Sequence, residues 1–449
     1  MSEVEAEGPR RFTLAHLILL VPWVALVIDA WSSITDNSFL WHVRAGTLQI
    51  EGVRVLTADP FSFTAGGEAW LTQSWLAELL YGWLEDISGG LGFVPWLLLA
   101  ITGLTFLGIG LIAYKASGSV LATSVVLILS TVSLISFLVP RPVVFSYLLF
   151  VLAILAWERP RSRWSIPFVF WVWASVHGSF FIGLAYIGLR LLSKREWRAM
   201  PTAIAAGVAT LLTAHGLGVI QMLLDFAAAR PYLGLLTEWR TPELLSPVFL
   251  PVFIGVVIII YGAMRQRLVP LDLLVIVPFF ALALTALRSV PPAWIALLIP
   301  VGAAMTGWGR SLPRRFGQGP ALIFALAVLV IPFFLAEGSG FDDDRFPTSL
   351  AAELDEAPVF HDDVVGGYLI WARGPALQVY IDDRAELFQE RIEQFVEIRN
   401  GREPWEAEFQ RFDIDQALLR EGEPMIDWLT EAGWASVAEE DGFVLLRSG

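Results

Sequence analysis

Long apolar runs fill most of this 449-residue chain and leave few folds open to it. Within these runs, the apolar residues do not recur at the period of an amphipathic helix or a strand, so no face is set aside for water. Hydrophobic residues make up 56% of the chain and charged residues only 16%, whereas a soluble domain is roughly 45–50% apolar. Runs of this length are typical of helices that cross a bilayer. The sequence therefore predicts a mainly α-helical polytopic membrane protein.

Eleven apolar runs are candidates for transmembrane helices. They cover residues 14–34, 93–114, 120–139, 143–157, 164–176, 180–192, 203–224, 248–264, 271–287, 290–308 and 321–335. Several of them are shorter than the ~20 residues that a perpendicular span needs. The stretch 164–192 can be read as one helix or as two short helices hinged at His177-Gly178, and the choice reverses the orientation of everything that follows.

The distribution of Lys and Arg favours one of these topologies. Cytoplasmic loops of membrane proteins carry an excess of basic residues. With two helices in 164–192, 15 basic residues fall on the cytoplasmic side and 6 on the opposite side before the C-terminal segment, whereas one helix gives 9 and 12. The two-helix topology fits better. It predicts a plasma-membrane protein with a cytoplasmic N-terminus and an extracytoplasmic C-terminal segment.

The net charge of −14 is concentrated near the C-terminus. After Gly338 there are 26 acidic and 9 basic residues, and the rest of the chain has 18 and 21. Short strand-like runs follow, at 358–360, 368–371, 377–381, 416–419, 435–437 and 443–446, with helical stretches at 385–399, 405–412 and 424–432. We therefore expect a membrane domain over residues 1–337 and a small acidic α/β domain over residues 338–449. A domain this acidic is not expected to bind nucleic acid.

Polar residues gather on the predicted extracytoplasmic side. The first outer loop, residues 35–92, mixes aromatic side chains with Asp, His, Gln and Glu. A carboxylate can act as a general base and arginines can hold a phosphate, so this set suits chemistry on an anionic substrate. The alternative is that each residue is an interfacial side chain or part of a structural salt bridge. The candidates are Asp36, His42, Arg44, Asp59, Gln73, Glu78, Arg141, His177, Glu238 and Arg288.

The acidic C-terminal domain contains a second candidate site. Asp382, Asp383 and Arg384 directly follow a strand-like run, and α/β sheets often place binding groups at such ends. These residues could contact an acceptor or a metal ion, or they could form only a strand-end turn with surface ion pairs. The sequence leaves both interpretations open.

Several common catalytic motifs are absent from the sequence. It contains no cysteine, no Gly-rich phosphate loop, no His-Glu-x-x-His and no Gly-x-Ser-x-Gly. The predicted inner loops are too short to hold a nucleotide-binding domain. A cytoplasmic nucleotide is therefore not expected as an energy source or donor.

The order of several motifs resembles a group of bacterial polytopic proteins with a GT-C-like membrane fold. The motifs are Asp-x-x-x-x-Trp-His-x-x-x-Gly at 36–46, Asp-Pro-Phe-Ser-Phe-Thr at 59–64, Trp70 with Gln-Ser-Trp-Leu-Ala-Glu at 73–78, Arg-Pro at 141–142, His-Gly at 177–178, Gly-Gly-Tyr-Leu at 366–369 and Ile-Asp-Asp-Arg at 381–384. The resemblance implies a glycosyltransferase that takes a sugar from a polyprenyl-phosphate carrier at the outer leaflet. It also implies a carboxylate in the first outer loop that serves as base or binds a divalent cation, and Asp36 is the candidate.

One position departs from the pattern of that group. Members often carry a second acidic residue four positions before the histidine, and here that position is Ser38. Either Asp36 suffices, or Asp59 supplies the second carboxylate, or the transferase activity has been lost. The sequence does not choose among the three.

The hypothesis from the sequence is therefore a membrane glycosyltransferase with an extracytoplasmic site. Asp36 would deprotonate the acceptor, Arg141 and Arg288 would bind the phosphate leaving group, and His42, His177 and Glu238 would line the pocket. The alternatives are a transporter or flippase without chemistry, and a degenerate transferase that acts as a scaffold. The sequence does not identify the sugar, the acceptor, any metal or the oligomeric state.

Overall fold

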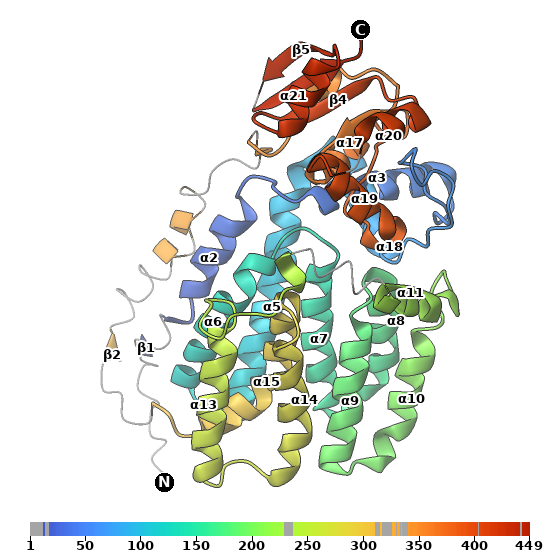
Figure 1. The fold of residues 1–449 in the computed structure, drawn as a ribbon. Helices are drawn as coiled ribbons and strands as arrows, with labels where there is room; N and C mark the ends of the chain where they lie inside the picture. Colours follow the sequence, from blue (N-terminus) through green and yellow to red (C-terminus); the bar gives the residue numbers. More distant parts are fainter. Residues whose placement is uncertain are drawn as a thin grey trace, which may run out of the picture.

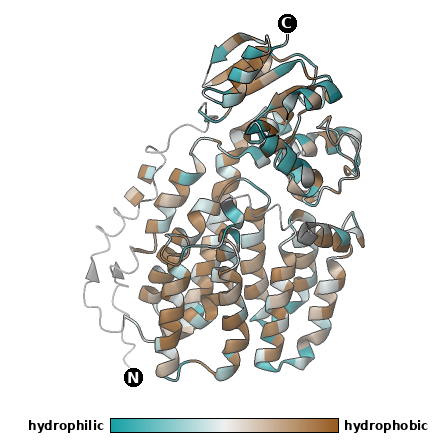
Figure 2. Ribbon diagram, in the orientation of Figure 1, coloured by the Kyte–Doolittle hydropathy of each residue, from teal (hydrophilic) through white to brown (hydrophobic). Residues whose placement is uncertain are grey.

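A layer of helices carries a smaller C-terminal domain at one end in the computed structural model (Figure 1). The structure describes residues 12–13, 18–228, 237–309, 315–316, 326–328, 330–332, 334, 340–342, 344–402, 404–440 and 442–449. The predicted run at 321–335 and the beginning of the run at 14–34 lie largely outside these residues. Apolar residues dominate the helical layer, whereas the C-terminal domain mixes hydrophobic and hydrophilic residues (Figure 2).

The helical layer is built from the predicted apolar runs. Its helices are α2 (Val21–Ala30), α5 (Val94–Ser117), α6 (Val120–Leu134), α7 (Val143–Trp157), α8 (Ile166–Val176), α9 (Phe180–Lys194), α10 (Met200–Ala209), α11 (Gly218–Ala228), α13 (Leu250–Met264), α14 (Leu273–Ala283) and α15 (Val290–Ala304). Among the described residues, three helical stretches are long and apolar enough to cross a membrane, at Leu91–Ser117, Val120–Phe137 and Leu287–Ala304. The chain is thus a membrane protein. The prediction of eleven spans is not confirmed, because the other apolar helices are shorter.

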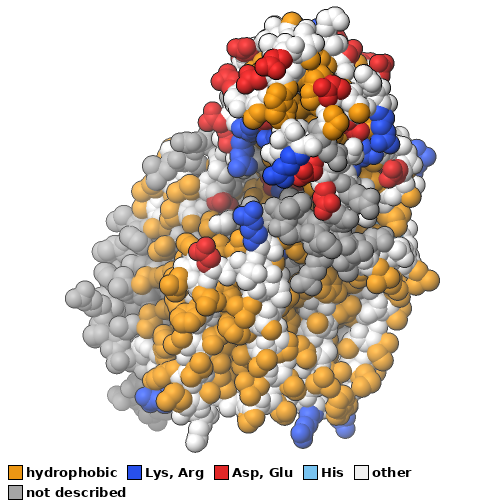
Figure 3. Space-filling view, viewed as in Figure 1, with side chains coloured by type: hydrophobic (Ala, Val, Ile, Leu, Met, Phe, Trp, Pro, Cys, Tyr) orange, Lys and Arg blue, Asp and Glu red, His pale blue; other side chains and the backbone are white. Residues whose placement is uncertain are grey.

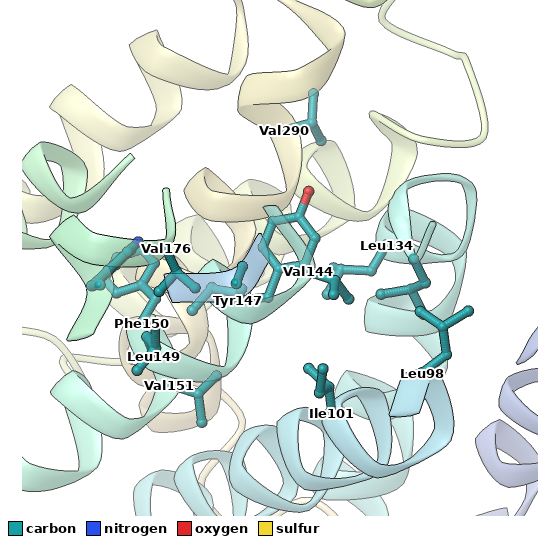
Figure 4. Close-up of a cluster of buried hydrophobic side chains, with 14 of the residues drawn as sticks. Leu98, Ile101, Leu134, Val144, Tyr147, Leu149, Phe150, Val151, Val176 and Val290 are labelled. Atoms are coloured by element: carbon teal, nitrogen blue, oxygen red, sulfur yellow. The ribbon is translucent and has the colours of Figure 1, made fainter. Parts of the chain in front are cut away.

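The core of the layer lies between α5, α6, α7 and α15. Leu98 and Ile101 of α5, Leu134 of α6 and Val144 of α7 belong to this buried cluster (Figure 4). The indole nitrogen of the fully buried Trp294 in α15 donates a hydrogen bond to the Ser130 hydroxyl of α6, at 2.8 Å. This bond satisfies a polar group that would otherwise be costly to bury.

Residues 164–192 form two helices, α8 and α9, with His177 and Gly178 in the turn between them. Gly183 of α9 faces the Phe170 and Trp173 rings of α8, so the second helix folds back along the first. The run at 203–224 differs from the prediction, because it divides into α10 and α11 with a turn at residues 210–217. His215 in this turn bonds the Thr72 carbonyl oxygen at 2.7 Å, which ties the turn to the first outer loop.

The first outer loop contains two helices, α3 (Asn37–Gly52) and α4 (Trp75–Ser88). They cross with almost no separation at Gly46 and Gly82. A Cβ atom added to Gly46 would overlap the backbone of Glu78, and one added to Gly82 would overlap the backbone of Gly46. Only glycine permits this approach. The crossing fixes the position of α3 at the end of the helical layer.

The C-terminal domain contains a four-stranded sheet with the order β3-β4-β6-β5. Its strands are β3 (Val359–His361), β4 (Gln416–Arg420), β5 (Ala435–Glu440) and β6 (Phe443–Arg447), and its helices are α17 (Asp363–Arg373), α18 (Ala385–Phe388), α19 (Glu390–Arg399), α20 (Trp405–Phe412) and α21 (Pro424–Glu431). Strand β3 runs parallel to β4, and the other pairs are antiparallel.

Two strand predictions in this domain are wrong in detail. Residues 368–371 belong to helix α17, and residues 377–381 contribute only isolated bridges, at Val379 to Ser62 and Val359. The apolar run in α17 packs against α3, so tertiary contact rather than strand propensity determines its conformation. The predicted helix at 385–399 is interrupted at Gln389, whose φ is 35°.

The C-terminal domain docks directly on the first outer loop. The Asn37 side chain at the start of α3 donates to the Asp363 carbonyl oxygen and accepts from the Tyr368 backbone N–H, at 3.1 and 3.2 Å. A Cβ atom on Gly367 would overlap the Asn37 carbonyl oxygen, so a larger residue would push α17 away. Buried residues of α17 and of the membrane helices share one hydrophobic cluster. The two parts of the chain therefore meet in a packed interface.

Candidate functional site

Asp36 lies at the junction of the helical layer and the C-terminal domain. It is the N-cap of α3, and its Oδ1 accepts a hydrogen bond from the Phe39 backbone N–H at 2.8 Å. Its Oδ2 accepts from Arg141 Nε at 2.6 Å. Asp36 is thus oriented by a helix start on one side and by a guanidinium on the other.

Arg141 is surrounded by three carboxylates. Besides Asp36, Glu238 and Asp383 approach its guanidinium to 3.7 and 3.8 Å. Burial alone would lower the pKa of Arg141, but the three negative charges outweigh it and raise that pKa, so the group stays protonated. Its positive charge is already matched by acidic neighbours, and it offers little net attraction to an additional anion.

Glu238 connects two arginines. Arg288 Nη1 lies 3.1 Å from Glu238 Oε1, while Arg141 lies near the other oxygen of the same carboxylate. The Arg288 guanidinium also stacks over the Trp239 ring, 4.4 Å from the ring centre. Arg288 has one carboxylate partner among the described residues, against three for Arg141. Its positive charge is therefore less completely compensated.

A polar cavity of about 910 Å³ opens between the helical layer and the C-terminal domain. Asp36, Arg141, Glu238 and Asp383 line it, together with acidic and basic residues of the C-terminal segment. Seven carboxylates and four arginines face this space. The cavity is acidic on balance, and its wall can donate and accept many hydrogen bonds.

A second, mainly apolar cavity of about 760 Å³ is enclosed by the helical layer, the first outer loop and helix α18 of the C-terminal domain. Its wall includes Phe150, Trp173 and Leu282, and polar groups enter it at Gln73, His177, Arg288, Ser146 and Glu386. Burial, followed by the nearby Arg288 charge, lowers the pKa of His177 to about 3, so its imidazole is neutral. An apolar chamber with a few polar groups is typical of a small-molecule site.

Two adjacent carboxyls in the polar cavity have pKa values shifted in opposite directions. Burial and the neighbouring Asp362 raise the pKa of Asp363 to about 8. Burial acts against ionisation of Asp362 too, but the hydrogen bond from Asp363 and the Arg399 charge lower its pKa overall. At neutral pH the pair therefore carries about one negative charge.

The predicted site residues His42, Arg44 and Glu78 line neither cavity. The His42 imidazole is 2.8 Å from Glu78, and this fully buried carboxylate also accepts bonds from Gln49 and Thr72. Together they tie α3 to α4. Arg44 donates to the Gly374 carbonyl oxygen at 2.7 Å, which fixes the end of α17. The structure places these side chains in the scaffold that supports the site.

Asp59 also lies outside the cavities, in a buried ion pair with Arg384. The distance from Arg384 Nη1 to Asp59 Oδ1 is 2.7 Å, and Asp382 binds the other side of the guanidinium. The side chains of all three are fully buried. Asp59 further accepts the Phe61 and Ser62 backbone N–H groups. This cluster anchors the C-terminal domain to the first outer loop and separates Asp59 from Asp36.

The carboxylates of the described residues do not converge as metal ligands do. Among the residues that the structure describes, no three Asp, Glu or His side chains converge closely enough to hold an ion. Arg141 lies between Asp36 and Asp383, where a cation shared by the two would be placed. The arrangement does not match the oxygen-rich shell of a divalent cation.

Two cavity residues went unnoticed in the sequence. Glu386 of α18 reaches the apolar cavity beside Trp70, and burial raises its pKa. The buried Ser146 hydroxyl of α7 lines the same cavity and has no hydrogen-bond partner among the described residues. No motif marks either residue. Only the proximity of Glu386 to the conspicuous 382–384 segment could have drawn attention to it.

No family model matches the chain, and no curated protein is similar to it in sequence. A solved structure, the apo form of the Archaeoglobus fulgidus oligosaccharyltransferase, has a similar fold, with a TM-score of 0.55 and 10% sequence identity. The match covers 90% of this chain and 69% of the archaeal one. At this level of identity the similarity concerns the fold alone.

Proposed function

We propose that the protein is a membrane glycosyltransferase that moves a sugar from a polyprenyl-phosphate-linked donor to an extracytoplasmic acceptor. The observation that carries the proposal is the bridge made by Glu238. This carboxylate contacts Arg141, which holds Asp36 in the polar cavity, and Arg288, which lines the apolar cavity. The lipid tail of the donor would bind in the apolar cavity, and the polar acceptor would bind in the polar cavity on the other side of Glu238.

The chemistry needs one base and one stabilised leaving group. Asp36 would take the proton of an acceptor hydroxyl as that oxygen attacks the anomeric carbon. The bond between that carbon and the phosphate oxygen breaks, and its electron pair leaves with the polyprenyl phosphate. The proton ends on the Asp36 carboxylate and returns later to water. The carboxylates of the described residues do not form the ligand shell of a divalent cation, so the proposed step uses the side chains alone.

Arg288 is the arginine best suited to the phosphate. It lines the apolar cavity, and its charge is less compensated than that of Arg141. Arginine binds phosphate through paired N–H donors, and this attraction increases as negative charge develops on the leaving group. We assign Arg141 a different role, which is to orient the Asp36 carboxylate.

The orientation in the membrane is part of the proposal. A broad hydrophobic belt lies between a charged C-terminal domain and basic side chains at the opposite edge of the helical layer (Figure 3). By the excess of basic residues in cytoplasmic loops, that opposite edge would face the cytoplasm. The polar cavity and the C-terminal domain would then be extracytoplasmic, in the plasma membrane.

A non-catalytic lipid-binding or scaffolding role is the second candidate. The observation in its favour is the close Asp36–Arg141 ion pair, which engages the carboxylate proposed as base. In a transferase this pair must loosen or shift as the acceptor binds. In a scaffold it would simply persist.

The test uses the full-length protein in nanodiscs and a set of undecaprenyl-phosphate-linked hexoses and pentoses. Release of undecaprenyl phosphate is measured with and without cell-envelope extract as the source of acceptor. We expect acceptor-dependent release with at least one donor, and an Arg288→Gln variant should lower that rate about 10²-fold. Tight binding of undecaprenyl phosphate without turnover of any donor would favour the scaffold and overturn the transferase proposal.

A further inference from the structure

Asp383 of the C-terminal domain is inserted beside the first turn of α3. Its Oδ2 accepts a short hydrogen bond from the Ser38 hydroxyl, and its Oδ1 accepts from the Trp41 indole N–H at 2.8 Å. The same Oδ2 lies 3.8 Å from Arg141. Asp36 and Asp383 thus flank one guanidinium, although they come from opposite ends of the chain.

The neighbouring residues hold Asp383 firmly in this position. Arg384 is clamped by Asp59 and Asp382, and its guanidinium lies 4.6 Å from the centre of the Trp70 ring. The turn that carries Asp383 is therefore pinned to the first outer loop by a buried ion-pair network. A side chain on such a support keeps a constant position in the cavity, as a functional group requires.

Asp383 also retains the capacity to bind a ligand. A carboxylate accepts about four hydrogen bonds, and among the described residues Asp383 accepts one on each oxygen. Its side chain is 22% exposed and lines the polar cavity. By contrast, Asp382 and Asp59 are fully buried and bound to Arg384. Of these three carboxylates, Asp383 is the one that a substrate can reach.

We propose that Asp383 is a second working carboxylate of the transferase site, contributed by the C-terminal domain and placed where α3 itself carries only Ser38. It would accept hydrogen bonds from hydroxyl groups of a polyhydroxylated acceptor, while Asp36 takes the proton from the attacking one. This inference rests on the proposed function. It implies that the site is complete only when the C-terminal domain is docked.

Variants that move the carboxylate test the proposal. Asp383→Asn keeps the size of the side chain and removes its charge, and Ser38→Asp/Asp383→Ser transfers the carboxylate to the facing residue of α3. Asp427→Asn, on the exposed side of α21, is the matched control. Transfer from the active undecaprenyl-phosphate sugar is measured in nanodiscs, with undecaprenyl phosphate binding and protease resistance of the docked domain as separate readouts.

We expect Asp383→Asn to lower the maximal transfer rate about 10²-fold without changing undecaprenyl phosphate binding, since that ligand would use the other cavity. The relocated carboxylate should restore at least about a tenth of the lost rate, whereas Asp427→Asn should behave as wild type. An Asp383→Asn enzyme within threefold of wild type would overturn the inference. So would a relocation variant that is docked but as slow as Asp383→Ser alone. A wild-type protein that transfers no sugar would instead overturn the proposed function itself.

Discussion

The Asp36 carboxylate and the Arg141 guanidinium form an ion pair, with 2.6 Å between Oδ2 and Nε. The pair joins the start of α3 to the turn before α7. Asp36 has two roles here, because it also caps α3 through the Phe39 backbone N–H. A variant that keeps the helix cap but removes the proposed base is therefore the most informative one.

Asp36→Asn is such a variant. Asparagine caps a helix about as well as aspartate, but it cannot accept a proton. We expect the variant to fold with a melting temperature close to that of wild type, because Arg141 keeps Glu238 and Asp383 as partners, and to lose about 10²–10⁴-fold in transfer rate. Asp36→Ala should lose both the activity and about 1 kcal/mol of stability. Transfer retained by Asp36→Asn would remove this residue from the mechanism.

The buried Arg384 makes a prediction about stability. Its replacement by Met leaves Asp59 and Asp382 as uncompensated buried charges, and breaking such a pair costs about 3–5 kcal/mol. We expect a lower melting temperature and release of the C-terminal domain by limited proteolysis. Arg402→Met is the control, because its ion pair with Glu397 is exposed and worth at most about 1 kcal/mol. Equal effects of the two substitutions would contradict the anchoring role of Arg384.

The sequence was sufficient for local features of the fold. Charge counting favoured two helices at 164–192, and the structure contains α8 and α9 there. The break between α10 and α11 was not predictable from apolar content, because His215 is held by a contact with a distant loop. The run at 368–371 has the residue pattern of a strand, but it forms part of helix α17 because it packs against α3.

The candidate site also depends on contacts between residues that are distant in the sequence. Asp36, Asp59, Arg141 and Asp383 all stood out in the sequence, yet only three of them line the polar cavity. Asp36 and Asp59 are the same type of residue, and both lie in the first outer loop. Their difference arises from long-range partners, Arg141 for one and Arg384 for the other. A single sequence does not reveal pairings across 105 or 325 positions.

The Asp362–Asp363 pair predicts a pH dependence of stability. The pKa of Asp363 is about 8 in the folded protein, against roughly 3.9 for an unperturbed Asp. Between these values the folded state binds more protons than the unfolded state, so this group lowers stability as pH rises from about 4 to about 8. We expect Asp363→Asn to be less sensitive to pH than wild type over that range. Melting temperatures of both proteins across the range provide the measurement, and parallel curves would refute the assignment.

The apolar cavity leads to a prediction about lipid binding. Ser146 is 3% exposed, faces this cavity and leaves its hydroxyl unpaired among the described residues, so replacing it removes no protein hydrogen bond. Ser146→Leu should therefore fold while its added methyl groups occupy space that the lipid would need. We expect at least about tenfold weaker binding of undecaprenyl phosphate, corresponding to about 1.4 kcal/mol, measured by native mass spectrometry. Leu152→Phe adds bulk to the same helix at a position that is 41% exposed, and it should leave binding unchanged. If Ser146→Leu bound the lipid as tightly as wild type, the lipid would have to bind elsewhere. The assignment of the lipid to the apolar cavity and of the acceptor to the polar cavity would then be wrong.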